Sequence, residues 1–317
     1  MARGQVYLVG AGPGDPGLLT IRARQVLELA DVVLYDGLVG RGLLQLIPRR
    51  VRKLRVAKGP RSRNGVPQST INEILVREAK AGRQVVRLKG GDALLFSRGG
   101  EEAEMLREHR VPFEVVPGIS SALAAPTYAG IPVTDRRYSS SVALVTGHES
   151  SNKPDRSVHF DRLARSVDTL VILMGVASWG SIAKELLDAG IDPDTPVAAI
   201  RWATTRQQRT ELFTLGESQR PSVRARLRSP SVMVVGRTVA LAPRLRWVRG
   251  ERRSASRRFL QVAARSRLEP ANDRVEPKPP ETPRHAATRR RLRAPSKRSA
   301  SRTHRRRRTA GHAADTS

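Results

Sequence analysis

Short apolar runs alternate with longer amphipathic stretches over the first 248 residues. The apolar runs are rich in Val, Leu and Ile, which is typical of strands that are covered on both faces. Eight such runs are predicted as strands: Gln5–Gly10, Asp31–Tyr35, Gln84–Lys89, Phe113–Val116, Ser141–Thr146, Thr169–Met174, Pro196–Arg201 and Ser231–Gly236.

The stretches between these runs carry helical patterns. Asp15-Pro16 is a plausible start signal for the first helix, and Gly82 and Gly190 are stop signals. Repeated strand–helix alternation predicts α/β layers with mainly parallel sheets. The predicted helices are Ile21–Leu29, Gln68–Ala81, Glu101–His109 and Ser181–Ala189.

Pro117-Gly118 and the segment after it indicate a division of the chain near residue 118. From about residue 249 the alternation stops, and Arg, Ser, Pro and Ala take over. Scarce apolar residues and like-charge repulsion disfavour a packed core there. We therefore expect an N-terminal α/β domain (1–118), a C-terminal α/β domain (119–248) and a disordered Arg-rich tail (249–317).

The net charge of +29 is divided between the predicted folded domains and the predicted tail. Residues 251–317 hold 20 basic and 6 acidic side chains, and the remaining residues hold 38 and 23. The predicted folded part is therefore basic in its own right, and its charge needs an explanation separate from that of the tail.

The composition excludes several classes of chemistry. The chain has no cysteine, which rules out disulfides, thiolate metal sites and a cysteine nucleophile and fits a cytoplasmic protein. No apolar run approaches about 18 residues, so no membrane span is expected. The first residues enter a strand-like run directly, without the pattern of a signal peptide.

A glycine-rich turn follows the first predicted strand. Gly10 and Gly12 fit a dinucleotide-binding turn, but Asp15 stands where the third glycine should be. No Gly-Lys-Ser/Thr follows, so the turn is not a phosphate-binding P-loop. Taken alone, it is equally consistent with a tight turn that precedes a helix.

Two further loops follow predicted strands in the same way. Lys89-Gly90-Gly91-Asp92 ends one strand, and Pro117-Gly118-Ile119-Ser120-Ser121 ends another. Ligands bind beyond the carboxyl ends of strands in open α/β sheets, so such loops can form walls of one cleft. The alternatives are local: Asp92, Ser120 or Ser121 could cap a helix, and Gly99-Gly100 could begin one.

The order and spacing of the three loops resemble the tetrapyrrole (corrin/porphyrin) methylases, and within them the enzymes that methylate uroporphyrinogen III. The resemblance covers roughly residues 5–248. It implies two α/β domains with a cofactor cleft between them, S-adenosylmethionine in that cleft, and a homodimer. Matching segments elsewhere are Val32–Val39, Val66–Gln68, Leu144–His148, Thr169–Gly175, Gln207–Arg209 and Pro230–Leu241.

The resemblance also implies which residues contact the cofactor. Without it, Met174 and Leu95 would be assigned to the core. Two departures from the family pattern bear on the site, since Arg201 reverses a charge and Ala203 replaces a glycine. The implied contacts are Pro13, Gly90, Gly91, Asp92, Leu95, Ser120, Ser121, Met174 and Ala203.

The implied reaction is two successive methylations that convert uroporphyrinogen III to precorrin-2, on the route to sirohaem or cobalamin, with no metal. Asp36 is the implied proton acceptor and Lys58 the implied proton donor. Asp36 could instead cap a helix, and Lys58 could pair with a substrate carboxylate. The substrate carries eight carboxylates, which would explain a basic cleft. Candidate partners for those carboxylates are Arg61, Arg63, Arg136 and Arg137.

Other interpretations remain open at this level. The chain could be another precorrin methyltransferase of the same superfamily, or an RNA-associated methyltransferase that uses the basic tail. The tail could contact nucleic acid by itself, or it could be a solvated appendage without a specific partner.

Overall fold

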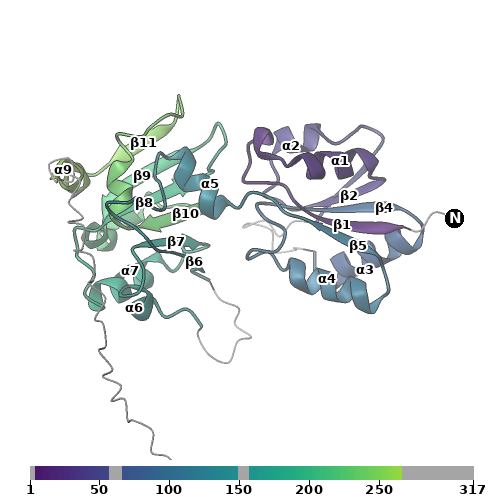
Figure 1. The fold of residues 1–317 in the computed structure, drawn as a ribbon, viewed down its shortest axis with the longest axis horizontal. Coiled ribbons are helices and arrows are strands. Elements are labelled where there is room, and N and C mark those ends of the chain that lie inside the picture. The colour runs from purple at the N-terminus through teal and green to yellow at the C-terminus, as the bar shows by residue number, and fades with distance from the viewer. Residues whose placement is uncertain (1–3, 57–65, 149–156, 266–317) are drawn as a thin grey trace, which may run out of the picture. The chain divides into compact units, whose positions relative to one another are not determined.

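Residues 4–56, 66–148 and 157–265 are described in the computed structural model, and these form two sheets with helices on both faces of each (Figure 1). The first sheet has the order β3-β2-β4-β1-β5, and every neighbouring pair in it is parallel. Its strands are β1 (Gln5–Gly10), β2 (Val32–Tyr35), β3 (Arg52–Arg55), β4 (Gln84–Lys89) and β5 (Phe113–Val116).

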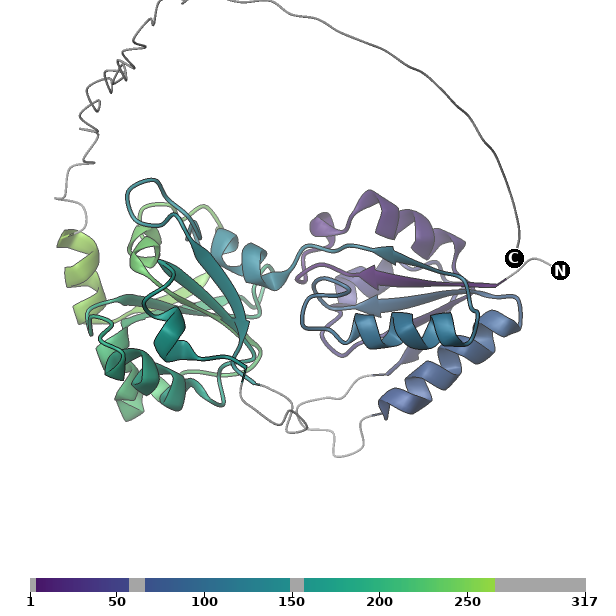
Figure 2. The same cartoon turned by 60° about the horizontal axis from the view of Figure 1, so that its bottom comes forward.

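Two separate apolar clusters cover the faces of the first sheet. On one face, α1 and α2 pack against Val9, Val33 and Val86. On the other, α3 and α4 pack against Leu8 and Leu34 and lie side by side, as Figure 2 shows. The helices are α1 (Ile21–Leu29), α2 (Arg41–Gln45), α3 (Gln68–Lys80) and α4 (Gly99–Glu108).

The second sheet has the order β11-β9-β8-β10-β7-β6. The helices α5 and α9 cover one face together with a 3₁₀ turn, and α6, α7 and α8 cover the other. Its elements are α5 (Ser121–Tyr128), β6 (Val142–Thr146), α6 (Phe160–Leu163), β7 (Thr169–Leu173), α7 (Trp179–Asp188), β8 (Pro196–Arg201), β9 (Arg209–Thr214), α8 (Pro221–Arg224), β10 (Ser231–Val235), β11 (Arg252–Ala255) and α9 (Arg257–Arg265).

The prediction of mainly parallel sheets is wrong for this second sheet. The pairs β8–β9, β8–β10 and β7–β10 are antiparallel. Only residues 202–208 connect β8 to β9, and a parallel crossover needs about a dozen residues or more, so this pair can only be a hairpin. The strands β3 and β9 escaped the prediction because charged residues interrupt their apolar pattern.

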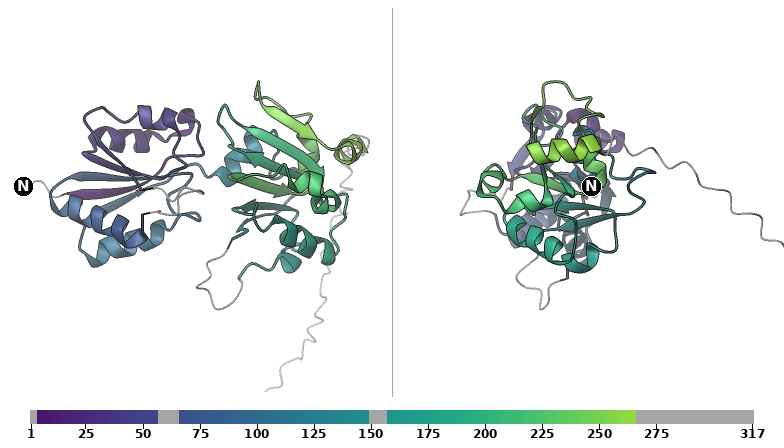
Figure 3. Two further views of the ribbon diagram at one scale, coloured as in Figure 1. Left: turned by 180° about the vertical axis from the view of Figure 1, so that it is seen from behind. Right: turned by 90° about the vertical axis from the view of Figure 1, so that its left-hand side faces the viewer.

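The predicted start of a disordered tail at residue 249 is also wrong. The strand β11 pairs with β9, and α9 buries Phe259 and Ala263 against the second sheet; Figure 3 shows this yellow-green helix lying along it. Glu251 is buried and bridges Arg253, Gln208 and Thr210. One apolar stripe and one buried acid are therefore enough to continue the fold to residue 265, and residues 266–317 lie outside the described part.

The predicted division at residue 118 falls between β5 and α5 and stays a prediction.

The start of the first helix differs from the prediction. Asp15 caps a 3₁₀ turn, Pro16–Leu18, whereas Thr20 caps α1 by accepting a hydrogen bond from the Ala23 amide at 3.1 Å. In the described ranges, no helix is long and apolar enough to cross a membrane.

Candidate cofactor site

A cavity of ≈ 230 Å³ lies where the loops that follow β1, β2, β4, β5 and β8 meet the ends of β7 and β10. All nine residues that the family resemblance implied as cofactor contacts line it. The full lining is Gly12, Pro13, Gly14, Leu38, Gly40, Gly90, Gly91, Asp92, Leu95, Phe96, Ser97, Ser120, Ser121, Leu173, Met174, Ile200, Trp202, Ala203, Thr205, Pro230, Ser231 and Val232.

Backbone contacts between glycines hold three of these loops together. Gly12 and Gly91 exchange two amide hydrogen bonds, of 3.0 and 2.8 Å. A Cβ on Gly118 would lie 2.5 Å from the Gly91 oxygen and 2.7 Å from Gly10, which leaves no room for a side chain. The glycines therefore allow the loops to touch by their main chains, and Gly12 and Gly91 also line the cavity.

Asp92 joins two of the loops through its carboxylate. Oδ1 accepts hydrogen bonds from the amides of Leu94 (2.8 Å) and Leu95 (2.9 Å), and Oδ2 accepts one from Gly118 (3.0 Å). Burial raises the pKa of Asp92, but these amides together outweigh it and hold the pKa below its usual value. Asp92 does not cap a helix as one alternative held, because α4 begins at Gly99.

The charge of the lining limits what the cavity can bind. Asp92 is the sole ionisable side chain in it, and no Lys or Arg is present among the lining residues. Among the described lining residues a phosphate would find no cation, whereas a ligand that carries positive charge would find a carboxylate. The cavity therefore suits a phosphate-free ligand.

Large apolar side chains around the cavity are exposed. Leu38, Phe96 and Met174 are 56%, 40% and 49% accessible, although side chains of this kind gain free energy when buried. The assignment of Met174 to the core, made without the family resemblance, is therefore wrong. These side chains supply an apolar surface that a bound ligand would cover.

The backbone around the cavity is strained at three of its residues. Phe96, Met174 and Trp202 have φ values of 51°, 54° and 48°, which lie in the left-handed region that non-glycine residues seldom adopt. Such conformations cost about 1–3 kcal/mol each and gather at functional sites. The sequence did not predict these three conformations, because glycine is the residue type from which a positive φ is usually predicted.

Polar contacts also tie the first loop to the second sheet's side of the cavity. The Asp15 amide donates to Thr204 Oγ1 at 3.0 Å, and the Tyr128 hydroxyl donates to Asp15 Oδ2 at 2.8 Å. Burial and this hydrogen bond raise the pKa of Tyr128 to about 12, so it remains a donor at neutral pH. Sequence reasoning missed Thr204 and Tyr128, since their partner is 113 or more positions away.

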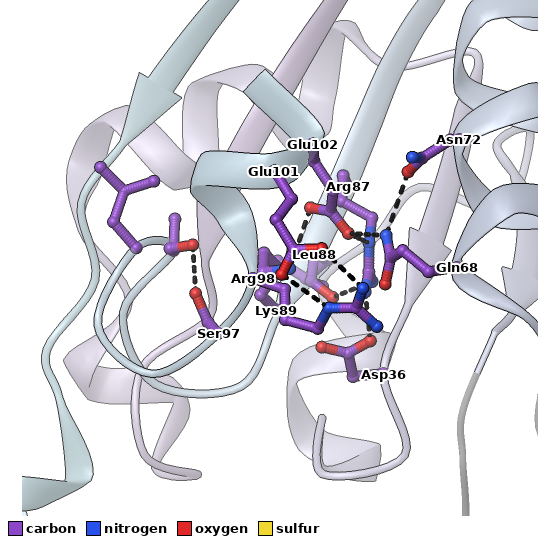
Figure 4. Close-up of polar contacts among 12 residues, drawn as sticks. Asp36, Gln68, Asn72, Arg87, Leu88, Lys89, Ser97, Arg98, Glu101 and Glu102 are labelled. Atoms are coloured by element: carbon purple, nitrogen blue, oxygen red, sulfur yellow. Dashed lines mark hydrogen bonds and ion pairs between the residues drawn. The ribbon is translucent and has the colours of Figure 1, made fainter. Parts of the chain in front are cut away.

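Asp36 lies just beyond the lining, in the loop that supplies Leu38. Its carboxylate does not cap a helix; it accepts a hydrogen bond from Arg87 Nη2 at 2.6 Å. Figure 4 shows that Arg87 also reaches Glu102, at 3.0 Å, and that Lys89 contacts the same carboxylate at 2.9 Å. Asp36 therefore belongs to a buried network of alternating charges.

The remaining predicted residues are less informative. Lys58, Arg61 and Arg63 lie outside the described residues. Arg136 and Arg137 do not line the cavity, and Arg137 pairs with Asp135 at 3.0 Å. Within the described ranges, no group of three or more His, Asp or Glu side chains is placed to hold a metal ion.

Comparisons with known proteins agree with this geometry. The model of the Tetrapyrrole (Corrin/Porphyrin) Methylases matches residues 5–219. An S-adenosyl-L-methionine-dependent uroporphyrinogen III methyltransferase of Methanosarcina barkeri is 47% identical over 75% of this chain and 93% of its own. A uroporphyrin-III C-methyltransferase of Thermus thermophilus, solved with S-adenyl homocysteine, is 42% identical with a TM-score of 0.64 over 74% of this chain and 93% of that one.

A longer relative matches as well. Siroheme synthase 1 of Halorhodospira halophila is 48% identical over 78% of this chain, but the match spans only 51% of that protein. The shared part is thus about half of the siroheme synthase and nearly all of the shorter methyltransferases. With the match to the family model and these identities, the chain belongs to the tetrapyrrole (corrin/porphyrin) methylase family.

Proposed function

We propose that the chain is an S-adenosylmethionine-dependent C-methyltransferase that converts uroporphyrinogen III to precorrin-2 by two methylations. The names of the M. barkeri and T. thermophilus relatives support this substrate, and the S-adenyl homocysteine in the latter supports the donor. The observation that carries the proposal is the lining of the cavity, whose described residues include one carboxylate, no cation and several exposed apolar side chains.

The residues present fit the donor. S-adenosylmethionine supplies a methyl group on a positively charged sulfur, so it needs no phosphate-binding cation. Asp92 places the only negative charge in the lining, and Leu38, Leu95 and Met174 offer apolar surface. The nine predicted contact residues would hold the donor chiefly through backbone groups and small side chains, which aligns it with the acceptor carbon.

We assign proton transfer to two residues of the predicted N-terminal α/β domain, Asp36 and Lys58. Asp36 would accept the proton that the macrocycle loses, and Arg87 fixes the orientation of its carboxylate through the 2.6 Å contact. Lys58 would return a proton elsewhere on the macrocycle. A positioned acid or base contributes about 10²–10⁴-fold to such steps.

Two expectations accompany this proposal: a homodimer, which the family resemblance implies, and a cytoplasmic location, which fits the absence of cysteine. The product could enter either sirohaem or cobalamin synthesis. A second candidate, methylation of a later precorrin, is compatible with the same fold, because a cobalt precorrin-4 methyltransferase superimposes with a TM-score of 0.66 at 25% identity. Only the choice of substrate separates the two.

Purified protein incubated with uroporphyrinogen III and labelled S-adenosylmethionine is expected to add two methyl groups per macrocycle. Mass spectrometry of the extracted product counts them directly. No methyl transfer would overturn the proposal. One or three methyl groups would favour another precorrin methyltransferase.

Asp36→Ala is expected to lower kcat about 100-fold because the proton acceptor is lost. The Kd for S-adenosylmethionine should stay near that of the wild type, because Asp36 does not line the cavity. Steady-state kinetics and calorimetry separate the two effects. Asp188→Ala, an exposed acid on α7, is the control. Full activity in both Asp36→Ala and Lys58→Ala would refute both assigned roles.

A further inference from the structure

Three arginines lie side by side at one end of three neighbouring strands of the second sheet. In the strand register, Arg201 of β8 pairs with Arg209 of β9, and Arg209 pairs with Arg252 of β11. Residues opposite each other on neighbouring strands point to the same face and are about 4.8 Å apart. Like charges in this arrangement repel and destabilise the sheet. We call these three residues the arginine row.

The row has no acidic partner in the described part of the structure. Neighbouring arginines differ in this respect, since Arg253 pairs with Glu251 at 2.6 Å and Arg226 with Glu211 at 3.5 Å. Arg201 also has a buried Nε without a hydrogen-bond partner among the described residues. A buried donor of this kind is costly unless something accepts from it.

Two cavities open onto the row, of ≈ 420 and ≈ 390 Å³, and both are lined by Arg201 and Arg209. Arg206 and Arg252 add positive charge to the first, and Arg226 and Arg228 add it to the second. Glu211 is the one acid in either lining, and Arg226 and Ser254 already engage it. Both cavities therefore favour an anion with more than one charge.

The row adjoins the cofactor cavity. Trp202 lines both that cavity and the first arginine cavity, and Ser231 lines both that cavity and the second. An anion held by the row would thus lie next to a ligand in the cofactor cavity. The two kinds of cavity differ in charge: arginines line the arginine cavities, whereas no Lys or Arg is among the described residues that line the cofactor cavity.

We propose that the arginine row binds side-chain carboxylates of the tetrapyrrole substrate and thereby selects a polycarboxylate macrocycle. This inference rests on the proposed function. A guanidinium matches a carboxylate through two parallel hydrogen bonds. Carboxylates on the rim of one macrocycle can bind neighbouring guanidinium groups while the ring faces the cofactor cavity. This binding relieves the repulsion between the arginines.

Arg201→Gln/Arg209→Gln tests the inference through binding of uroporphyrin III, the stable oxidised octacarboxylate, followed by fluorescence. The Kd is expected to rise about 100-fold, since each lost charged hydrogen bond accounts for about tenfold. The KM for uroporphyrinogen III should rise in parallel, while the Kd for S-adenosylmethionine stays unchanged. The melting temperature should be equal or higher, because the repulsion is removed.

Arg107→Gln is the matched control, because Arg107 is exposed on α4 and lines neither arginine cavity. Uroporphyrin binding by the double variant that equals binding by this control would overturn the inference. The inference would also be overturned if citrate or phosphate inhibited the wild type, and the double variant lost that inhibition but kept its uroporphyrin affinity. That result would indicate an independent small-anion site. Tight uroporphyrin binding that depends on the row, without methyl transfer, would overturn the proposed function alone.

Discussion

Replacing Gly118 with alanine is expected to weaken S-adenosylmethionine binding at least tenfold and to destabilise the fold by about 1–3 kcal/mol. The new Cβ would lie 2.5 Å from the Gly91 oxygen and 2.7 Å from Gly10. Both neighbours are main-chain atoms, so no side-chain rotation relieves the overlap. The loops after β1, β4 and β5 must separate, and the hydrogen bond from the Gly118 amide to Asp92 must weaken.

Gly100→Ala is the matched control for this experiment. A Cβ there meets nothing within 4 Å, and alanine favours the helix by up to about 1 kcal/mol over glycine. Calorimetry with S-adenosylmethionine and denaturant unfolding measure both effects. Donor affinity in Gly118→Ala equal to that in Gly100→Ala would show that the close contact of the three loops is not required for binding.

The positions of the loops could be predicted from the sequence, whereas the contacts between the loops could not. Glycine and small polar residues after apolar strands mark Gly12, Gly91 and Ser120 as loop positions, and the cavity contains all three loops. The contact of Gly118 with Gly10 depends on β1 and β5 being neighbours, and that strand order is not written in a local pattern. The resemblance supplied the grouping that spacing alone left ambiguous.

Charged residues misled the sequence prediction of where the fold ends, for a physical reason. Composition counts a charge without showing whether it has a partner. Around Glu251 and Arg253 the count predicted disorder, yet those two side chains pair and α9 buries Phe259. Along the arginine row the charges have no acidic partner within the described structure, and we propose that a ligand supplies one.

The same distinction bears on the buried network behind Asp36. Arg87 and Lys89 stand in an otherwise apolar strand, which signals that each needs a partner. Glu102, from α4, is wholly buried and accepts from both, and it also accepts from Gln68 Nε2 at 3.1 Å. Burial lowers the pKa of Lys89, and the carboxylate of Glu102 opposes that shift.

Glu102→Ala is therefore expected to cost about 3–5 kcal/mol of unfolding free energy, since it leaves Arg87 and Lys89 buried without their shared carboxylate. Denaturant unfolding measures the loss. Glu101→Ala, one residue away, removes an exposed pair with Arg98 and should cost at most about 1 kcal/mol. A loss below about 1 kcal/mol in Glu102→Ala would mean that water replaces the carboxylate.

The buried network is also expected to affect kcat. Arg87 holds Asp36 with one nitrogen and Glu102 with another, so the loss of Glu102 frees the guanidinium to move. Glu102→Ala should then lower kcat at temperatures where the protein is still folded, with the Kd for S-adenosylmethionine unchanged. Glu102→Gln, which can still hydrogen-bond to Arg87, should recover part of kcat. An unchanged kcat in Glu102→Ala would separate the network's role in stability from the orientation of Asp36.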